Sequence, residues 1–379
     1  MLSVLAIASA LSWLCIWILP WRPWSVCERL TAADDATRPR RQELASHDDV
    51  TVLIPARNEA ATIGRTLVAV AGQGEGLEII VVDDQSTDGT RQAIAATGLM
   101  NVKVVTGQAL PRGWSGKVWA LYQAEGLLRR PLVWLLDADI ETAPGLLTAL
   151  RRKIGGGSPG TVALVSLMAE LPMGTMVERL VLPPFIYFFK LLYPFALSNA
   201  AGSRVAAAAG GCVLLRVEAL HRIGGFAALR AALIDDCTLA ALVKREGFSS
   251  WTGLSRSLYS RRPSGGLKGI WALVSRTAFT QLCYSVWLLL ACTAAMVVVY
   301  MAPVLVAVAG DGWIRWTGAV TWVAMTLNFW PTVRFYCVGL GYAIALPVAA
   351  ALYLAMTWAS AIGYWRGTRS RWKARDYSV

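Results

Sequence analysis

Two acidic signatures stand directly after apolar runs, and they restrict the possible folds of this chain more than any other feature. Asp83 and Asp84 close the run LEIIVVDD. Asp137 and Asp139 close the run PLVWLLDAD. Carboxylates at the ends of buried strands lie at the carboxyl edge of a parallel sheet, where open α/β folds bind nucleotides. The sequence therefore predicts an α/β domain in which one acidic pair contacts a base or ribose and the other a divalent cation on the diphosphate.

Apolar runs and helix-like stretches alternate around these signatures. The alternation extends from Val50 to about Leu167. It is typical of βαβ units, which form a mostly parallel sheet with helices on both faces. We therefore expect a Rossmann-like α/β domain at residues 50–262, preceded by a polar linker at residues 22–49.

The composition indicates a membrane protein rather than a purely soluble one. Of the 379 residues, 56% are hydrophobic, and the mean hydropathy is +0.49. Residues 2–20 are apolar, uncharged and long enough to cross a bilayer, and Arg22 and Arg29 follow them. Since positive charge gathers on the cytoplasmic side, we expect a transmembrane anchor at residues 1–21 and a cytoplasmic α/β domain. A cleaved signal peptide is the alternative, but no basic region precedes the apolar run.

The last third of the chain holds three more apolar segments, near residues 286–309, 314–332 and 338–364. We expect transmembrane helices within residues 285–364 and a basic cytoplasmic tail at residues 365–379. Three full crossings would place that tail on the outer side, against the positive-inside rule. Either the shorter middle segment does not cross fully or the tail breaks the rule, and the sequence leaves the number of spans open.

Two segments have the composition of helices that lie along a membrane surface. Residues 181–197 are apolar and aromatic but include three prolines and Lys190. A crossing there would separate the downstream acidic motif from the other two, so we expect an interfacial segment that forms one wall of an entrance for a lipid acceptor. Residues 263–284 show near-helical apolar spacing with interleaved basic residues. This pattern predicts a second interfacial helix or a helix packed on the soluble core.

Charge and cysteine content argue against a nucleic-acid-binding protein and against a zinc protein. The net charge is +12, yet no nucleic-acid recognition motif accompanies it, and the densest basic cluster follows an apolar segment. This arrangement favours an anionic lipid surface over nucleic acid. The seven cysteines form no CxxC pair and there are only two histidines, so zinc-site spacing is absent and we expect free thiols.

Asp137 and Asp139 form a D-x-D pair whose side chains can turn to one cation. Such carboxylates are the hard oxygen ligands that Mg²⁺ or Mn²⁺ prefers, and they leave coordination positions for diphosphate oxygens. We therefore expect both residues to bind the metal, which would stabilise the charge on a leaving nucleoside diphosphate. An isolated D-x-D is usually an ordinary turn, and its place at a strand end favours the metal site here.

Other residues are expected around the nucleotide. Adjacent carboxylates such as Asp83 and Asp84 repel each other unless donors meet them, and a uracil N–H or a ribose hydroxyl would be such a donor. Lys117 ends a glycine-rich loop that can approach a phosphate closely, although a loop lysine is often simply solvated. Asp88 is expected to be structural, in a turn and helix cap. The residues expected to contact the nucleotide are Pro55, Arg57, Glu59, Asp83, Asp84, Lys117 and Asp137.

A third acidic pair lies downstream, where Asp235 and Asp236 open a helix that runs to Glu246. Such a pair is commonly a helix cap that offsets the macrodipole. Sugar transfer to a hydroxyl, however, needs a carboxylate that takes the acceptor proton. Asp236 is the expected base and Asp235 the second candidate. Gly210 and Gly211 are expected on the acceptor side.

The order of these motifs resembles the family-2 inverting glycosyltransferases with a GT-A fold. PARNE, VVDDQSTDGT, GWSGK, DAD, GG and DD-x-x-L follow one another over about residues 50–250. The sequences GWSGKVWAL, LIDDCTLA and SRTAFTQLCYS, followed by apolar segments, are similar to the hopene-associated glycosyltransferases of bacterial hopanoid gene clusters. Processive members of the family carry Q-x-x-R-W. Here Gln281 is followed by the sequence LCYS, which favours transfer of a single sugar.

The resemblance implies a hexosyl- or N-acetylhexosaminyltransferase that is a multi-pass protein of the bacterial inner membrane. It assigns nucleotide contact to Asp84 and Asp83, metal and diphosphate to Asp137 and Asp139, and the base to Asp236. The expected reaction moves one sugar from a nucleotide-diphosphate sugar, with a UDP-sugar favoured, to a lipid hydroxyl such as that of a hopanoid. Ceramide-like and polyprenyl-phosphate acceptors are alternatives. So are a non-catalytic nucleotide- or lipid-binding membrane protein and a transporter.

Overall fold

The chain forms two compact units, which are described in turn. A helical unit consists of Met1–Cys27, Met173–Ala196 and Pro263–Ser370, and an α/β unit of Glu28–Pro172, Leu197–Arg262 and Arg371–Val379. This computed structural model describes residues 1–32, 46–155, 162–230, 232, 234–367, 371–372 and 375–376. Parts of the expected linker at residues 22–49 and of the basic tail at residues 365–379 lie outside the described residues.

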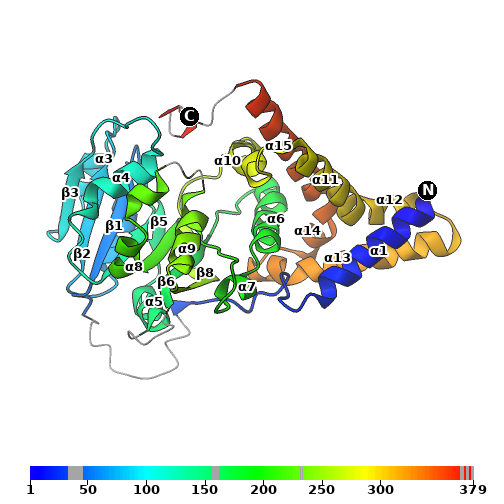
Figure 1. Cartoon of the computed structure of the whole chain (residues 1–379), viewed down its shortest axis with the longest axis horizontal. Helices are drawn as coiled ribbons and strands as arrows, with labels where there is room; N and C mark the ends of the chain where they lie inside the picture. The colour runs from blue at the N-terminus through cyan, green and yellow to red at the C-terminus, as the bar shows by residue number, and fades with distance from the viewer. Residues whose placement is uncertain are drawn as a thin grey trace. The chain divides into compact units, whose positions relative to one another are not determined.

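The α/β unit is built on a sheet whose described strands follow the order β3-β2-β1-β4-β7-β6-β8-β5 (Figure 1). They are β1 (Val50–Ala56), β2 (Glu78–Asp83), β3 (Val102–Thr106), β4 (Leu132–Leu136), β5 (Ile140–Thr142), β6 (Val162–Glu170), β7 (Cys212–Arg216) and β8 (Ser249–Ser260). The first four in the order run parallel. β7 is antiparallel to β4 and β6, and β8 is parallel to β6 but antiparallel to β5. The predicted α/β sheet is thus confirmed as mixed and mostly parallel.

Helices cover both faces of this sheet. They are α2 (Ile63–Ala71), α3 (Thr90–Ala95), α4 (Gly116–Glu125), α5 (Leu146–Ile154), α8 (Val217–Arg222) and α9 (Asp235–Arg245), with a 3₁₀ turn at Phe226–Leu229 and a short ladder of β9 (Arg371–Trp372) with β10 (Arg375–Asp376). Along β2, Ile79 and Val81 pack with α2, α3 and α5, whereas Ile80 and Val82 pack with α4, α8 and α9. The continuous apolar runs therefore reflect strands buried on both faces.

The parallel strands end together at one edge of the sheet. Ala56 of β1 is in register with Asp83 of β2, and Asp84 N donates to Ala56 O at 2.8 Å. β4 lies on the other side of β1 and ends immediately before Asp137. Both acidic signatures thus follow neighbouring carboxyl ends of the sheet, as the sequence predicts.

The helical unit contains the apolar segments. Its helices are α1 (Leu2–Ile18), α6 (Met176–Leu192), α10 (Gly266–Gln281), α11 (Val286–Met296), a π-helical turn (Val297–Met301), α12 (Ala302–Ala309), α13 (Gly312–Phe335), α14 (Leu340–Ile344) and α15 (Leu346–Trp365), and α7 (Phe195–Asn199) follows α6. Among the described residues, two helices are long and apolar enough to cross a membrane, Val286–Ala309 and Leu346–Trp365.

The other expected membrane segments are less clear-cut. α1 is apolar but has 17 residues, which is short of the roughly 20 that a crossing needs. The middle segment forms α13, which carries an arginine near each end and the buried Asn328. The transmembrane anchor at residues 1–21 and the exact number of spans stay predictions.

The predicted interfacial segment at residues 181–197 lies mainly in α6. This helix begins with a capping box between Thr175 and Glu178 and continues through Pro183 and Pro184. Its residues pack against α10, α13 and α15 within the helical unit. Tyr353 Oη donates to the main-chain oxygen of Val181 at 2.8 Å and so ties α15 to α6 two residues before Pro183. The position of the segment along a membrane surface is a prediction still to be tested.

Candidate active site

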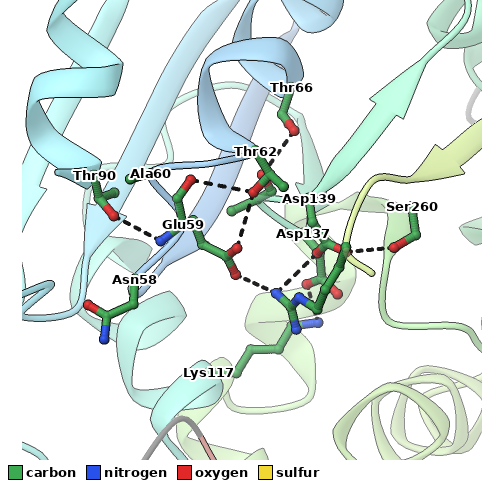
Figure 2. A network of polar contacts seen from close by, with 12 residues as sticks. Asn58, Glu59, Ala60, Thr62, Thr66, Thr90, Lys117, Asp137, Asp139 and Ser260 are labelled. Carbon is green, nitrogen blue, oxygen red and sulfur yellow. Dashed lines mark hydrogen bonds and ion pairs between the residues drawn. The ribbon is translucent and has the colours of Figure 1, made fainter. Parts of the chain in front are cut away.

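Lys117 and Asp137 form an ion pair at the carboxyl edge of the sheet. Asp137 Oδ1 lies 2.6 Å from Lys117 Nζ, which also donates to the main-chain oxygen of Gly210 at 2.9 Å. The sequence predicts Lys117 at the end of a loop; it lies in the first turn of α4, where Ser115 caps the helix by accepting from Val118 N. The helix start directs its ammonium to the D-x-D pair, as Figure 2 shows for Lys117 and Asp137.

Burial and charge act in opposite directions on this pair. Burial lowers the pKa of Lys117, but the carboxylates of Asp137 and Asp235 outweigh it and raise the pKa above its ordinary value. Burial raises the pKa of Asp137, Lys117 opposes that rise, and Asp139 adds to it. The site therefore gathers several carboxylates around one ammonium, and an additional cation would relieve their repulsion.

Contacts from the end of β8 hold Asp139. Ser260 Oγ donates to Asp139 Oδ2 at 2.7 Å, and a terminal nitrogen of Arg262 lies 3.3 Å from Asp139 Oδ1. Arg262 also pairs with Glu59, whose second oxygen accepts from Thr62 Oγ1 at 3.1 Å. Glu59, Asp139 and Ser260 are labelled in Figure 2. Glu59 is 7% exposed, so it is a buried member of this network rather than a surface charge.

The D-x-D pair suits a hard divalent cation. Asp137 and Asp139 offer only carboxylate oxygens, and among the described residues no group of three or more His, Cys, Asp or Glu side chains could hold a metal. For a cation at this pair, Asp137 and Asp139 would supply about two ligands, and diphosphate oxygens and water would fill the other positions, as Mg²⁺ usually requires. Lys117 and Arg262 each neutralise one carboxylate of the pair in this structure.

The loops that follow β1 and β2 are tied to each other. Asn58 Oδ1 accepts from Thr87 N at 2.8 Å. The Asp88 carboxylate accepts from Ala60 N at 3.1 Å and from Thr90 N at 3.0 Å. These contacts confirm the predicted structural role of Asp88, which joins the two loops immediately before α3, whose N-cap is Gly89.

Hydrogen-bond donors of the protein itself contact the Asp83 carboxylate. Its Oδ1 accepts from Ser86 N at 3.1 Å, and its Oδ2 pairs with Arg91. Burial alone would raise the pKa of Asp83, but Ser86 and Arg91 together lower it. Arg57 donates to the main-chain oxygen of Asp84 at 2.5 Å and so fixes the chain after β2. Nucleotide contact by Asp83, Asp84 and Arg57 stays a prediction, and a nucleotide is not needed to stabilise the Asp83 carboxylate.

Asp236 lies in the first turn of α9 and is held by two main-chain donors. Its Oδ2 accepts from Gly210 N at 2.8 Å and its Oδ1 from Cys237 N at 2.7 Å. Burial, followed by the charge of Asp235, raises the pKa of Asp236 to about 6. A carboxylate with such a pKa is suited to take a proton near neutrality. Asp236 lines one cavity with Pro55, Lys117, Asp137, Gly210 and Asp235.

Gly210 connects the D-x-D pair to the downstream acidic pair. Its carbonyl accepts from Lys117 and its N–H donates to Asp236. A Cβ at this position would lie 3.1 Å from Lys117 Nζ and 3.3 Å from Asp236 Oδ2, so the close approach favours glycine. Gly211 O accepts from Asp137 N at 3.1 Å. These contacts give both glycines a structural role, and the expected acceptor contact stays a prediction.

Two residues of the site, Ser260 and Arg262, were not predicted. Ser260, Arg261 and Arg262 end or follow β8, whose polar and small residues conceal the strand in the sequence. Arg261 N donates to the main-chain oxygen of Asp139 at 2.8 Å, and its side chain pairs with Glu141. The sequence signal that could have identified them is the arginine pair after Ser260, just as carboxylates follow β2 and β4, but the strand before that pair has to be recognised first.

Comparison with known proteins finds a family match over most of the α/β unit. Residues 51–224 match the model of the family described as glycosyl transferase family 2. The match includes the D-x-D pair and ends before Asp235 and Asp236.

Two curated relatives match over shorter stretches. The chain is 34% identical over 95 residues to 4,4'-diaponeurosporenoate glycosyltransferase of Staphylococcus aureus, which is 25% of each chain. It is 33% identical over 115 residues to succinoglycan biosynthesis protein ExoU of Rhizobium meliloti, which is 29% of this chain and 32% of that protein. The matched stretch thus spans about a quarter to a third of the length of these relatives. Neither name concerns hopanoids, so the hopene-associated resemblance stays a prediction.

A solved structure shares the fold over nearly the whole chain. It is the mannosyltransferase PcManGT from Pyrobaculum calidifontis in complex with GDP-Man and Mn²⁺. The TM-score is 0.56 at 20% identity, and the comparison covers 97% of this chain and 100% of that one. The likeness shows a common GT-A-like fold.

Proposed function

We propose that this chain, a glycosyltransferase of family 2 by its domain at residues 51–224, moves one sugar from a nucleotide-diphosphate sugar to a lipid hydroxyl. One observation carries the proposal. A single cavity is lined by Lys117 and Asp137 from the metal side and by Asp235 and Asp236 from the third acidic motif. The reaction requires these two kinds of group on opposite sides of one anomeric carbon.

The donor side of the proposal rests on the D-x-D pair and its neighbours. PcManGT holds GDP-Man with Mn²⁺, which supports a nucleotide-sugar and a divalent cation here. Asp137 and Asp139 would hold Mg²⁺ or Mn²⁺, and such a cation stabilises charge on the departing diphosphate. Lys117, which contacts Asp137 and Gly210, would contact the same phosphates. A UDP-sugar is the donor that the motif order favours.

On the acceptor side, Asp236 is the proposed base. The acceptor oxygen forms the new bond to the anomeric carbon while the bond to the diphosphate oxygen breaks, and the hydroxyl proton passes to the Asp236 carboxylate. The bonds from Gly210 N and Cys237 N fix the orientation of that carboxylate. One displacement inverts the anomeric centre.

A membrane lipid is the proposed acceptor class. The S. aureus relative is named for the glycosylation of diaponeurosporenoate, a carotenoid. Within the described residues, two helices are apolar and long enough to cross a membrane. A hopanoid is the finer proposal that follows from the motif resemblance, with ceramide-like and polyprenyl-phosphate lipids as alternatives.

Release of nucleoside diphosphate tests the proposal. The purified full-length chain is expected to release UDP or GDP from at least one of UDP-glucose, UDP-N-acetylglucosamine and GDP-mannose, and a lipid extract should stimulate the release. Fractionating the extract then identifies the acceptor class. Donor binding without release, with every donor and extract, would instead indicate a non-catalytic binding protein.

We further propose that the α/β unit and both ends of residues 181–197 face the cytoplasm of a bacterial inner membrane. The exposed Met176 and Ala201 flank that segment. In a background without the seven native cysteines, Met176→Cys and Ala201→Cys should both resist a membrane-impermeant thiol reagent in spheroplasts and react after lysis. Labelling of only one of them in intact spheroplasts would show that the segment crosses the membrane.

A further inference from the structure

Arg262 brings a positive charge to the carboxylate that is proposed to hold a cation. Its guanidinium pairs with Glu59 and lies 3.3 Å from Asp139 Oδ1. Glu59 and Asp139 are 7% and 6% exposed, respectively. The Arg262 side chain itself is 48% exposed, so it reaches a buried acidic pair from a solvated position.

These contacts compensate two buried charges. A buried carboxylate without a partner is costly, and a planar guanidinium can serve two carboxylates at once. Glu59 follows β1, Asp139 follows β4 and Arg262 follows β8. Arg262 therefore links three separate strand ends around the D-x-D pair.

A guanidinium and a divalent cation compete when they bind the same carboxylate. Asp139 Oδ2 is already engaged by Ser260, and Oδ1 is the oxygen that Arg262 approaches. Metal binding at Asp139 therefore has to overcome both the contact and the repulsion of a fixed positive charge a few ångströms away. A bound diphosphate removes this competition, because its negative charge attracts both the metal and the guanidinium.

We propose that Arg262 is a positioning residue that couples metal binding to donor binding. In the donor-free protein it holds Glu59 and Asp139 and weakens the affinity for a free divalent cation. When the nucleotide arrives, its diphosphate takes over the guanidinium and leaves Asp139 to the cation. This inference rests on the proposed function, and it predicts that cation and nucleotide bind with strong positive coupling.

Mn²⁺ binding, followed by electron paramagnetic resonance without turnover, tests the coupling. The full-length protein in detergent is titrated with Mn²⁺ alone and with saturating UDP or GDP, whichever the donor screen selects. Arg262→Gln is expected to bind Mn²⁺ alone about tenfold more tightly than wild type, equivalent to about 1.4 kcal/mol. The gain in Mn²⁺ affinity caused by the nucleotide should shrink by at least about tenfold.

Arg261→Gln is the matched control because it removes the same charge one residue away. Arg261 pairs with Glu141, and its contact to Asp139 comes from the main chain. Its Mn²⁺ affinity should stay within about twofold of wild type, since the exposed ion pair contributes little. Arg262→Lys keeps the positive charge but loses the planar guanidinium that can bind two carboxylates. Its Mn²⁺ affinity should lie between those of wild type and Arg262→Gln. It also serves as the second variant if Arg262→Gln does not fold.

The outcomes separate this inference from the proposed function. Unchanged Mn²⁺ affinity in Arg262→Gln and Arg262→Lys, or an equal change in Arg261→Gln, overturns the role of Arg262. Asp139→Asn should abolish specific Mn²⁺ binding in the same assay. If Asp139→Asn loses Mn²⁺ binding while the Arg262 variants bind Mn²⁺ like wild type, the proposed metal site is supported and the coupling through Arg262 is wrong. If Asp139→Asn binds Mn²⁺ normally, the metal site of the proposed function is itself wrong.

Discussion

Asp137→Ala and Asp139→Ala are each expected to abolish measurable sugar transfer while the protein stays folded and membrane-bound. The two carboxylates are the proposed ligands of the divalent cation, and loss of several kcal/mol of charge stabilisation on the leaving diphosphate lowers the rate by at least about a hundredfold. EDTA should have the same effect on wild type, and added Mg²⁺ or Mn²⁺ should reverse it. Turnover is measured as nucleoside diphosphate released per enzyme.

A surface carboxylate provides the control for this prediction. Glu218 forms an exposed ion pair with Arg222 on α8, and Glu218→Ala should leave turnover and thermal stability nearly unchanged. Removing Asp139 also leaves Arg262 with Glu59 alone, so the melting temperature is compared as well. Full activity in EDTA, or in either aspartate variant, would show that the D-x-D pair is an ordinary turn.

Asp236→Asn should lose at least about a hundredfold in turnover and keep its affinity for the donor. Asparagine is nearly isosteric but cannot take a proton, and general-base assistance typically contributes about 10²–10⁴ in rate. Donor affinity is unaffected because the proposed task begins when the acceptor attacks. If Asp236 only stabilises the first turn of α9, asparagine serves nearly as well and turnover should barely change. Calorimetric donor binding and turnover, measured in parallel, distinguish these cases.

Asp235→Asn and the pH profile identify the base. The Asp236 pKa is raised to about 6, so the base is protonated and turnover falls as the pH drops through that value. Removing the Asp235 charge lessens the repulsion that raises this pKa. Asp235→Asn should therefore stay active and shift the acidic limb of the profile to lower pH. Collapse of Asp235→Asn with normal turnover in Asp236→Asn would assign the base to Asp235.

The parts of the site that follow parallel strands were predictable from the sequence. Ile79 to Val82 form a continuous apolar run because both faces of β2 are covered. The first polar residue after such a run shows in the sequence where the strand ends. The apolar runs alone were therefore enough to place Asp83, Asp84, Asp137 and Asp139 at the carboxyl edge of the sheet. The spacing of these motifs also carried the family resemblance.

The parts that depend on pairing between strands distant in the sequence were not predictable. β7 and β8 enter the sheet far from their neighbours in the chain, and their register is set by packing against β4 and β6 rather than by a local pattern. Arg262 and Ser260 could not be assigned to Asp139 without that register. The glycines before Lys117 predict that it ends a loop, whereas the Ser115 cap starts the helix one residue earlier.

The pairing of β5 with β8 has a consequence for how this site forms as the chain is synthesised. Asp139 precedes β5, which pairs with β8, and the hydroxyl that holds its carboxylate belongs to Ser260, 121 positions later. Contacts so distant in sequence form late, because the intervening chain must be ordered before they are made. The family match ends at residue 224, before β8 begins. A nascent chain of that length can pair β1 to β4 and carry both acidic signatures on their strands, but it lacks β8 and the Ser260 hydroxyl that holds Asp139.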